Sequence, residues 1–245
     1  MLARDSTGMT PVVLVHGGGF AGSCWDLLVG HLDGPVLAVD LPGRGSHPAP
    51  LESVTIAGAA ASVAADIDAA GFDEIVLVGH SLAGCSMPAT MGLLGSRVRH
   101  AVFVACTVPA HGTSCFDTLE PDIQAYARAA AESGELGRLS DDMAKVMFGN
   151  DLDDAQFAWC VDHMVPEAPM LTLETVDLSP LRSATPRTWV RPLRDAIVSP
   201  EKQLQFLEYV QPCTLVDLDA AHMCMISKPR ELAAIINDVA RQPSG

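Results

Sequence analysis

The stretch from Ile75 to Gly84, IVLVGHSLAG, constrains this chain more than any other. Its first four residues are apolar and three of them are β-branched, which is typical of a strand buried on both faces of a parallel sheet. Small residues then surround Ser81, and an Ala- and Met-rich segment with helical character follows. A strand, a tight turn with serine at its apex and a helix form a nucleophile elbow, whose positions two before and two after the serine must be small. Gly79 and Ala83 meet this requirement, although glycine is usual at the second position.

Short apolar runs alternate with helical segments up to residue 108 and again after residue 187. This alternation predicts an α/β fold with a mostly parallel, doubly wound sheet. The expected strands span residues 12–15, 36–39, 75–78, 102–105, 187–193 and 213–218. The expected helices of this part span residues 23–32, 54–70, 83–94, 200–210 and 229–240.

The alternation stops between residues 109 and 186, where only helical segments at 122–132, 140–148 and 153–162 are indicated. Because the strand–helix pattern resumes afterwards, an insertion explains this region better than a second domain. At 245 residues the chain fits one large α/β domain. We therefore expect a core formed by residues 1–108 and 187–245, with residues 109–186 inserted as a helical cap.

Composition excludes several partners. The formal net charge of −15 argues against nucleic acid and anionic membranes, both of which bind basic patches. No apolar run approaches the ~20 residues that span a bilayer, and the N-terminus lacks a signal-peptide pattern, so a cytoplasmic location is expected. The seven cysteines include no C-x-x-C pair and are expected to be buried free thiols. The sequence leaves open whether the protein forms a homodimer.

A glycine-rich loop introduces a competing interpretation. Gly17, Gly19 and Gly22 follow an expected strand and open an expected helix, and Asp40 ends the next strand. This spacing matches the fingerprint of dinucleotide-binding folds, so an NAD- or flavin-dependent oxidoreductase is an alternative. His16 and the unbroken glycines after it match an H-G-G-G oxyanion loop equally well, and no tyrosine is followed four residues later by lysine. Hydrolytic chemistry has a visible residue set, and hydride transfer does not.

A serine hydroxyl becomes a good nucleophile when a histidine takes its proton and a carboxylate orients that histidine. On this type of sheet the chain order is serine, acid, histidine. His222 is the best base, because it follows the last expected strand, where parallel sheets place functional residues. Asp195, directly after the preceding strand, is favoured as the acid, with Asp217 and Asp219 as alternatives.

The oxyanion that forms on attack needs two preorganised N–H donors. One should be the backbone N–H of Leu82, next after the serine, and the other should come from the glycine loop, from Gly18. His16 is expected to brace this loop through a backbone contact. His80 is expected to be structural, and His100 to lie on the surface.

With these elements assembled, the whole chain resembles the α/β-hydrolase superfamily, and most closely its plant-type methylesterase and hydroxynitrile lyase branch. The resemblance is carried by VLVHGGG at 13–19, CW at 24–25, DLPGRG at 40–45, LVGHSLAG at 77–84, RD at 194–195 and AHMCMISKP at 221–229. It implies hydrolysis of small esters without cofactor or metal, through Ser81, Asp195 and His222 and the backbone amides of Gly18 and Leu82.

The resemblance also speaks to the lyase alternative. Lyases of this branch have threonine after the strand-end histidine and lysine after the catalytic histidine. Here these positions hold Gly17 and Met223, so cyanohydrin cleavage is not expected. Two alternatives remain. The same triad could cleave a lactone, amide, thioester or C–C bond, or the protein could be a non-catalytic binding protein. The candidate substrate pocket consists of apolar and aromatic residues that flank catalytic positions or belong to the cap: Phe20, Trp159, His163, Met164, Ile197 and Met223.

Overall fold

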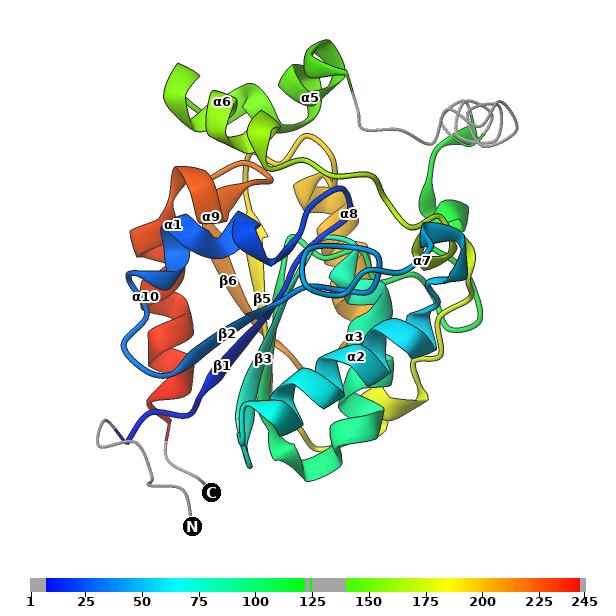
Figure 1. The fold of residues 1–245 in the computed structure, drawn as a ribbon, viewed down its shortest axis with the longest axis vertical. Coiled ribbons are helices and arrows are strands. Elements are labelled where there is room, and N and C mark those ends of the chain that lie inside the picture. Colours follow the sequence, from blue (N-terminus) through cyan, green and yellow to red (C-terminus); the bar gives the residue numbers. More distant parts are fainter. Residues whose placement is uncertain (1–7, 122–123, 125–139, 243–245) are drawn as a thin grey trace.

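Six parallel strands form one sheet at the centre of the computed structural model, which describes residues 8–121, 124 and 140–242. The strand order is β2-β1-β3-β4-β5-β6, and every neighbouring pair is parallel (Figure 1). This confirms the predicted α/β fold. The strands are β1 (Val12–Val15), β2 (Val36–Val39), β3 (Ile75–His80), β4 (Val98–Val104), β5 (Arg187–Pro192) and β6 (Thr214–Leu218).

The strand β4 begins four residues before its predicted start. Arg99 and His100 interrupt the apolar run, so the sequence pattern hid the first residues of the strand. His100 is buried, and its Nε2 lies 2.9 Å from the Thr188 hydroxyl on the neighbouring strand. The prediction of a surface position for His100 is therefore wrong, because a hydrogen bond across the sheet satisfies its polar ring.

Helices cover both faces of the sheet (Figure 1). One face carries α2 (Ile56–Ala69), α3 (Ala83–Leu94) and α8 (Pro200–Tyr209). The other carries α1 (Asp26–Val29), α9 (Cys224–Ser227) and α10 (Pro229–Ala240). Local signals start two of these helices: the Thr55 hydroxyl accepts the Gly58 N–H, and Ser199 caps α8 just before Pro200.

The helix predicted at 23–32 is shorter than expected. A 3₁₀ turn at Gly22–Trp25 leads into the single turn of α1. His31 and Leu32 then continue the chain with i→i−3 hydrogen bonds to Leu28 and Val29, the tighter pattern that helix ends adopt. Gly30 at the end of α1 is a poor helix former and explains why the α-helix does not extend.

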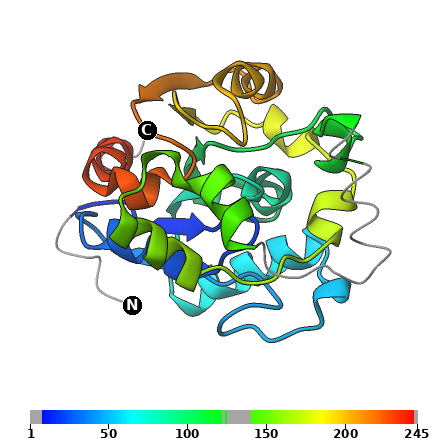
Figure 2. The ribbon, with the colours of Figure 1, turned by 90° about the horizontal axis from the view of Figure 1, so that it is seen from above.

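Three described helices lie between β4 and β5: α5 (Asp141–Phe148), α6 (Asp154–Asp162) and α7 (Met170–Leu173). The helices predicted at 140–148 and 153–162 match the first two, whereas the segment 122–132 lies outside the described residues apart from residue 124. The helix α6 begins with a capping box in which Asp153 and Gln156 satisfy each other's backbone N–H. Figure 1 shows α5 and α6 at the top of the molecule, beyond the carboxyl ends of the strands, and in Figure 2, seen from above, they lie in front of the sheet.

The cysteines and the apolar character of the helices are both subjects of the sequence-based expectations. All seven cysteines are free thiols, and six of them are buried, with Cys213 half-buried. Within the described ranges, no helix has the length and apolar character needed to cross a membrane.

Close packing explains the glycines around Ser81. A Cβ on Gly79 would lie 2.2 Å from the Met87 sulfur, and a Cβ on Gly84 would lie 2.4 Å from the Thr107 carbonyl oxygen. The clash at Gly84 is with backbone, which cannot rotate away as the end of a side chain can. The structure accommodates Ala83 where glycine is usual, and the residue that must be glycine is Gly84, one position further along α3.

We expect Gly84→Ala to lower the free energy of unfolding by about 1–3 kcal/mol, the range for overpacked sites, because α3 must move away from Thr107. Urea denaturation measures this. Gly30→Ala is the control, since its φ of −64° suits alanine and a Cβ there would have nothing within 4 Å. Equal effects of the two substitutions would contradict the packing explanation.

Candidate active site

The turn that carries Ser81 joins β3 to α3. Ser81 has a φ of 53°, in the left-handed region that non-glycine residues rarely occupy. Its N–H donates to the Val104 carbonyl oxygen, and its own carbonyl oxygen accepts from Gly84 and Thr107, each at 3.0 Å. These bonds hold the strained turn and leave the Ser81 side chain half-exposed at the carboxyl end of β3.

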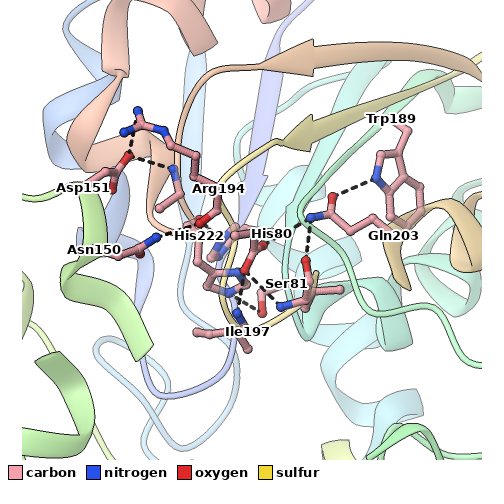
Figure 3. A network of polar contacts seen from close by, with 12 residues as sticks. His80, Ser81, Asn150, Asp151, Trp189, Arg194, Ile197, Gln203 and His222 are labelled. Atoms are coloured by element: carbon pink, nitrogen blue, oxygen red, sulfur yellow. Dashed lines mark hydrogen bonds and ion pairs between the residues drawn. The ribbon is translucent and has the colours of Figure 1, made fainter. Parts of the chain in front are cut away.

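His222 lies beside Ser81 at this edge of the sheet (Figure 3), and Asp195 contacts the other ring nitrogen of His222. The Ser81 Oγ lies 2.9 Å from His222 Nε2, and His222 Nδ1 lies 2.7 Å from Asp195 Oδ2. Asp195 follows β5 and His222 follows β6, and both are almost fully buried. The structure thus brings together the three side chains that the sequence grouped as serine, base and acid.

The Asp195 carboxylate is held by several N–H groups. Its Oδ1 accepts from the backbone N–H groups of Ile197 and Val198, at 2.8 and 2.9 Å. Its Oδ2 accepts from His222 and also from Gln203 Nε2 at 3.3 Å. Gln203 in turn accepts a hydrogen bond from buried Trp189 (Figure 3). No local pattern in the sequence indicates this role for Gln203, because a single glutamine on a helix carries no signal for such a contact.

The two alternative acids lie elsewhere. Asp217 forms a bidentate pair with Arg191 at 2.8 and 2.9 Å, on the exposed side of the sheet edge. Asp219 pairs with Arg194 at 2.8 Å, and its side chain is 83% exposed. Of the three candidate carboxylates, only that of Asp195 lies against His222 in the described structure.

His16 holds the glycine loop beside Ser81. Its Nδ1 donates to the Gly17 carbonyl oxygen at 2.8 Å, and its Nε2 accepts the Leu41 N–H at 3.1 Å. Burial, assisted by the nearby Arg44 charge, lowers the pKa of His16 to about 4, so the ring is neutral and can both donate and accept. The expected backbone contact is confirmed. It fixes the plane of the peptide that carries the Gly18 N–H.

The glycine loop packs directly on the turn. A Cβ on Gly17 would lie 2.9 Å from the Ser81 Cβ and 2.8 Å from the His80 ring, and a Cβ on Gly18 would lie 3.1 Å from the Leu82 side chain. Within the part of the chain that the structure describes, neither the Gly18 N–H nor the Leu82 N–H donates a hydrogen bond. These two free N–H groups beside a serine hydroxyl are the kind of donors that form an oxyanion hole.

His80 supports the loop of His222. Its Nε2 donates to the His222 carbonyl oxygen at 3.0 Å, which the contact in Figure 3 illustrates. Burial, with a further contribution from nearby His222, lowers the pKa of His80 well below its usual value. His80 is therefore a neutral structural residue, as expected from its place beside the serine.

Residues between β4 and β5 contact the loops of both the acid and the base. The Asn150 side chain donates to the Arg194 carbonyl oxygen, and the Asp151 carboxylate accepts the Ala221 N–H, both at 2.7 Å (Figure 3). The Phe148 ring stacks on His222 with centroids 6.1 Å apart. Asn150 and Asp151 have no motif around them, so the sequence alone did not indicate these contacts.

The six candidate pocket residues belong to the packing between this helical region and the sheet. Three are buried there and two others are partly buried against them, while His163 stacks on Trp159 with ring centroids 3.7 Å apart. The buried ones are Phe20, Met164 and Met223, and the partly buried ones are Ile197 and Trp159. None of the six lines the cavity of about 10 Å³ beside the glycine loop, which is lined by residues that include Gly18, Leu82, Arg44 and Glu167. This space would hold roughly one water molecule.

The sheet is parallel and doubly wound, the serine lies on a strained strand-to-helix turn after β3, and the acid and the histidine follow β5 and β6. Together these features define an α/β hydrolase. The comparison with known families agrees: the model of the alpha/beta hydrolase family matches residues 12–235, and the chain belongs to this family.

Named relatives refine the comparison. The chain is 27% identical to a putative chloroplastic methylesterase 14 of Arabidopsis thaliana, over 94% of this chain and 72% of the relative. It is also 27% identical to the probable esterase PIR7A of Oryza sativa, over 93% and 95% of the two chains. Among solved structures, an extracellular alpha/beta-hydrolase from a Paenibacillus species has a TM-score of 0.86 at 18% identity, covering 95% of this chain and all of that one. The resemblance to the plant methylesterase branch is confirmed.

The two buried neutral histidines predict a pH-dependent stability. The unfolded chain takes up protons at both positions near pH ~6.5, whereas the folded protein resists protonation of His16 down to about pH 4. The unfolded state therefore binds more protons in this window, and stability is complete above it and falls as the pH drops through it. His16 contributes about 3 kcal/mol of this loss by pH 4, and about 2 kcal/mol of it by pH 5.

Urea denaturation at pH 7.5 and pH 5 measures the effect. The decrease should be smaller in His16→Gln than in His111→Gln, whose side chain is 64% exposed. A free energy of unfolding that stays constant between the two pH values would contradict the assignment.

Proposed function

We propose that this protein is a serine hydrolase that cleaves small carboxylic esters through an acyl-enzyme on Ser81. The observation that carries the proposal is the series of hydrogen bonds that joins buried Asp195 to buried His222 at 2.7 Å and His222 to the half-buried Ser81 hydroxyl at 2.9 Å. The names of the relatives, methylesterase and esterase, support an ester as the substrate. Residues 109–186 act in this proposal as the cap over the substrate.

In the first half of the reaction, His222 Nε2 takes the proton of Ser81 as the Oγ attacks the ester carbonyl carbon. Asp195 keeps the Nδ1 proton in place and stabilises the imidazolium that forms. His222 then gives its proton to the departing alcohol, and the acyl group stays on Ser81. Water, deprotonated by His222, attacks the acyl-enzyme and releases the carboxylic acid.

The negative charge that develops on the carbonyl oxygen is stabilised by the N–H groups of Gly18 and Leu82. Loss of one such donor costs roughly 3 kcal/mol of transition-state stabilisation. His16 supports this geometry through the Gly17 carbonyl, and the turn at Ser81 places the Leu82 N–H beside the nucleophile.

The competing interpretations receive less support. Asp40, the residue that would bind a ribose, already accepts hydrogen bonds from the Gly22 N–H and from the Ser46 N–H and hydroxyl. The glycine loop opens a short 3₁₀ turn rather than a long helix. For the lyase, a threonine at position 17 would bring its Cβ within 3 Å of His80 and Ser81, and Met223 offers no cation for a departing cyanide.

We expect Ser81→Ala to abolish hydrolysis of p-nitrophenyl acetate and covalent labelling by a fluorophosphonate, because both need the activated hydroxyl. Release of p-nitrophenol and intact-protein mass spectrometry measure the two reactions. Ser53→Ala is the control, since this serine hydroxyl bonds only locally to Pro50 on the surface. Full activity of Ser81→Ala would refute the mechanism, and labelling without turnover would favour a different substrate class.

The assignment of the acid predicts different outcomes for three aspartates. Asp195→Asn should lower kcat by about 10³–10⁴-fold, because the amide no longer stabilises the correct His222 tautomer. Asp217→Asn and Asp219→Asn remove the alternative carboxylates and should change kcat less than about twofold, since both side chains pair with arginine at the surface. A large loss in either control would show that another carboxylate supports the base.

A further inference from the structure

The segment after α6 forms hydrogen bonds with both backbone polar groups of Gly19 in the glycine loop. The Val165 N–H donates to the Gly19 carbonyl oxygen at 2.8 Å, and the Gly19 N–H donates to Glu167 Oε2 at 2.7 Å. Gly19 has a φ of +73°, so its conformation is one that only glycine adopts easily. The loop that carries the Gly18 N–H is therefore fixed from outside the sheet, by a residue 148 positions away from Gly19 in the sequence.

Arg44 holds the carboxylate of Glu167. This arginine lies in the loop after β2 and is 4% exposed, and its Nη2 forms an ion pair with Glu167 Oε1. The Ala168 N–H also donates to that oxygen, at 2.5 Å. Both carboxylate oxygens of Glu167 thus accept hydrogen bonds. Oε1 accepts from Arg44 and from the Ala168 N–H, and Oε2 accepts from the Gly19 N–H of the glycine loop. An arginine buried to this extent needs a charged partner, because an unpaired buried charge is strongly destabilising.

We propose that Glu167 is a positioning residue for the oxyanion hole: held by Arg44, it fixes the peptide between Gly18 and Gly19 and so directs the Gly18 N–H at the reacting oxygen. The inference rests on the proposed hydrolase function. Gly18 lies between two peptide planes, of which His16 fixes the first through the Gly17 carbonyl and Glu167 fixes the second through the Gly19 N–H. With the second contact removed, the flexible glycines can rotate and the donor loses its direction.

The position of the carboxylate agrees with this role. Glu167 Oε2 lies 2.9 Å from where a Cβ of Gly18 would be, so the carboxylate packs against the donor residue itself. Burial raises the pKa of Glu167, while the Arg44 charge and the N–H groups of Gly19 and Ala168 act in the opposite direction. Pairing with Arg44 also neutralises a negative charge that would otherwise oppose the developing oxyanion.

The test compares Glu167→Gln and Glu167→Leu, each combined with Arg44→Met so that no buried arginine is left unpaired. Both double variants lack the ion pair, and they differ in whether residue 167 can accept the Gly19 N–H. For p-nitrophenyl acetate, we expect kcat of the Leu variant to fall about 10–100-fold, less than the loss of a whole oxyanion donor, with KM changed less than about threefold. The Gln variant should keep a kcat at least about threefold higher than that of the Leu variant, because its amide oxygen can still accept the Gly19 N–H although Arg44 no longer holds the side chain.

Glu174→Leu is the matched control. Glu174 lies at the end of α7 and accepts the Ile56 N–H at the start of α2, also at 2.7 Å, so it makes the same kind of contact away from Ser81. We expect this variant to lose thermal stability but to keep kcat. Circular dichroism melts verify that every variant is folded at the assay temperature.

The outcomes separate the two proposals. If the two double variants lose kcat equally, if neither loses it, or if Glu174→Leu loses as much, Glu167 is only a structural residue and the inference is wrong. If the wild type neither hydrolyses the ester nor reacts with a fluorophosphonate, the hydrolase function itself fails. The rate of fluorophosphonate labelling gives a second readout, because the phosphonyl oxygen occupies the oxyanion hole during the reaction, and it should fall in the Leu variant alone.

Discussion

The hydrogen bond between His222 and Asp195 is the contact on which the candidate site depends. It exists because β5 and β6 are parallel neighbours, so the loops that follow them leave the sheet side by side. Ser81 reaches the same place from β3 through a backbone conformation that helices and strands do not use. The sheet therefore determines which side chains can meet, and burial then makes each polar contact costly to lose.

Two histidines next to this contact serve the backbone. His16 binds the Gly17 carbonyl, and His80 binds the carbonyl of His222. Burial lowers the pKa of both rings, which keeps them neutral and lets each donate one hydrogen bond without carrying a charge into the site. Of His16, His80 and His222, only His222 forms a hydrogen bond with the Ser81 hydroxyl in the described structure.

The region between β4 and β5 takes part in the site through its contacts with three loops. Asn150 binds the loop of Asp195, Asp151 binds the loop of His222, and Glu167 binds the glycine loop. Each contact joins a side chain of this region to a backbone group of the core. A change in the helical region can therefore alter the geometry of the candidate site without changing Ser81, Asp195 or His222.

The sequence by itself determined the alternation of strands and helices, the turn at Ser81 and the order of serine, acid and histidine, because these follow from local periodicity and from the stereochemistry of tight turns. Local patterns failed where polar residues entered a strand, as His100 did in β4. Only the tertiary structure decided that Asp195 rather than Asp217 faces His222, and that Glu167 contacts Gly19 and Arg44. These pairs are far apart in the chain, and no local preference records which distant side chain will satisfy a buried polar group.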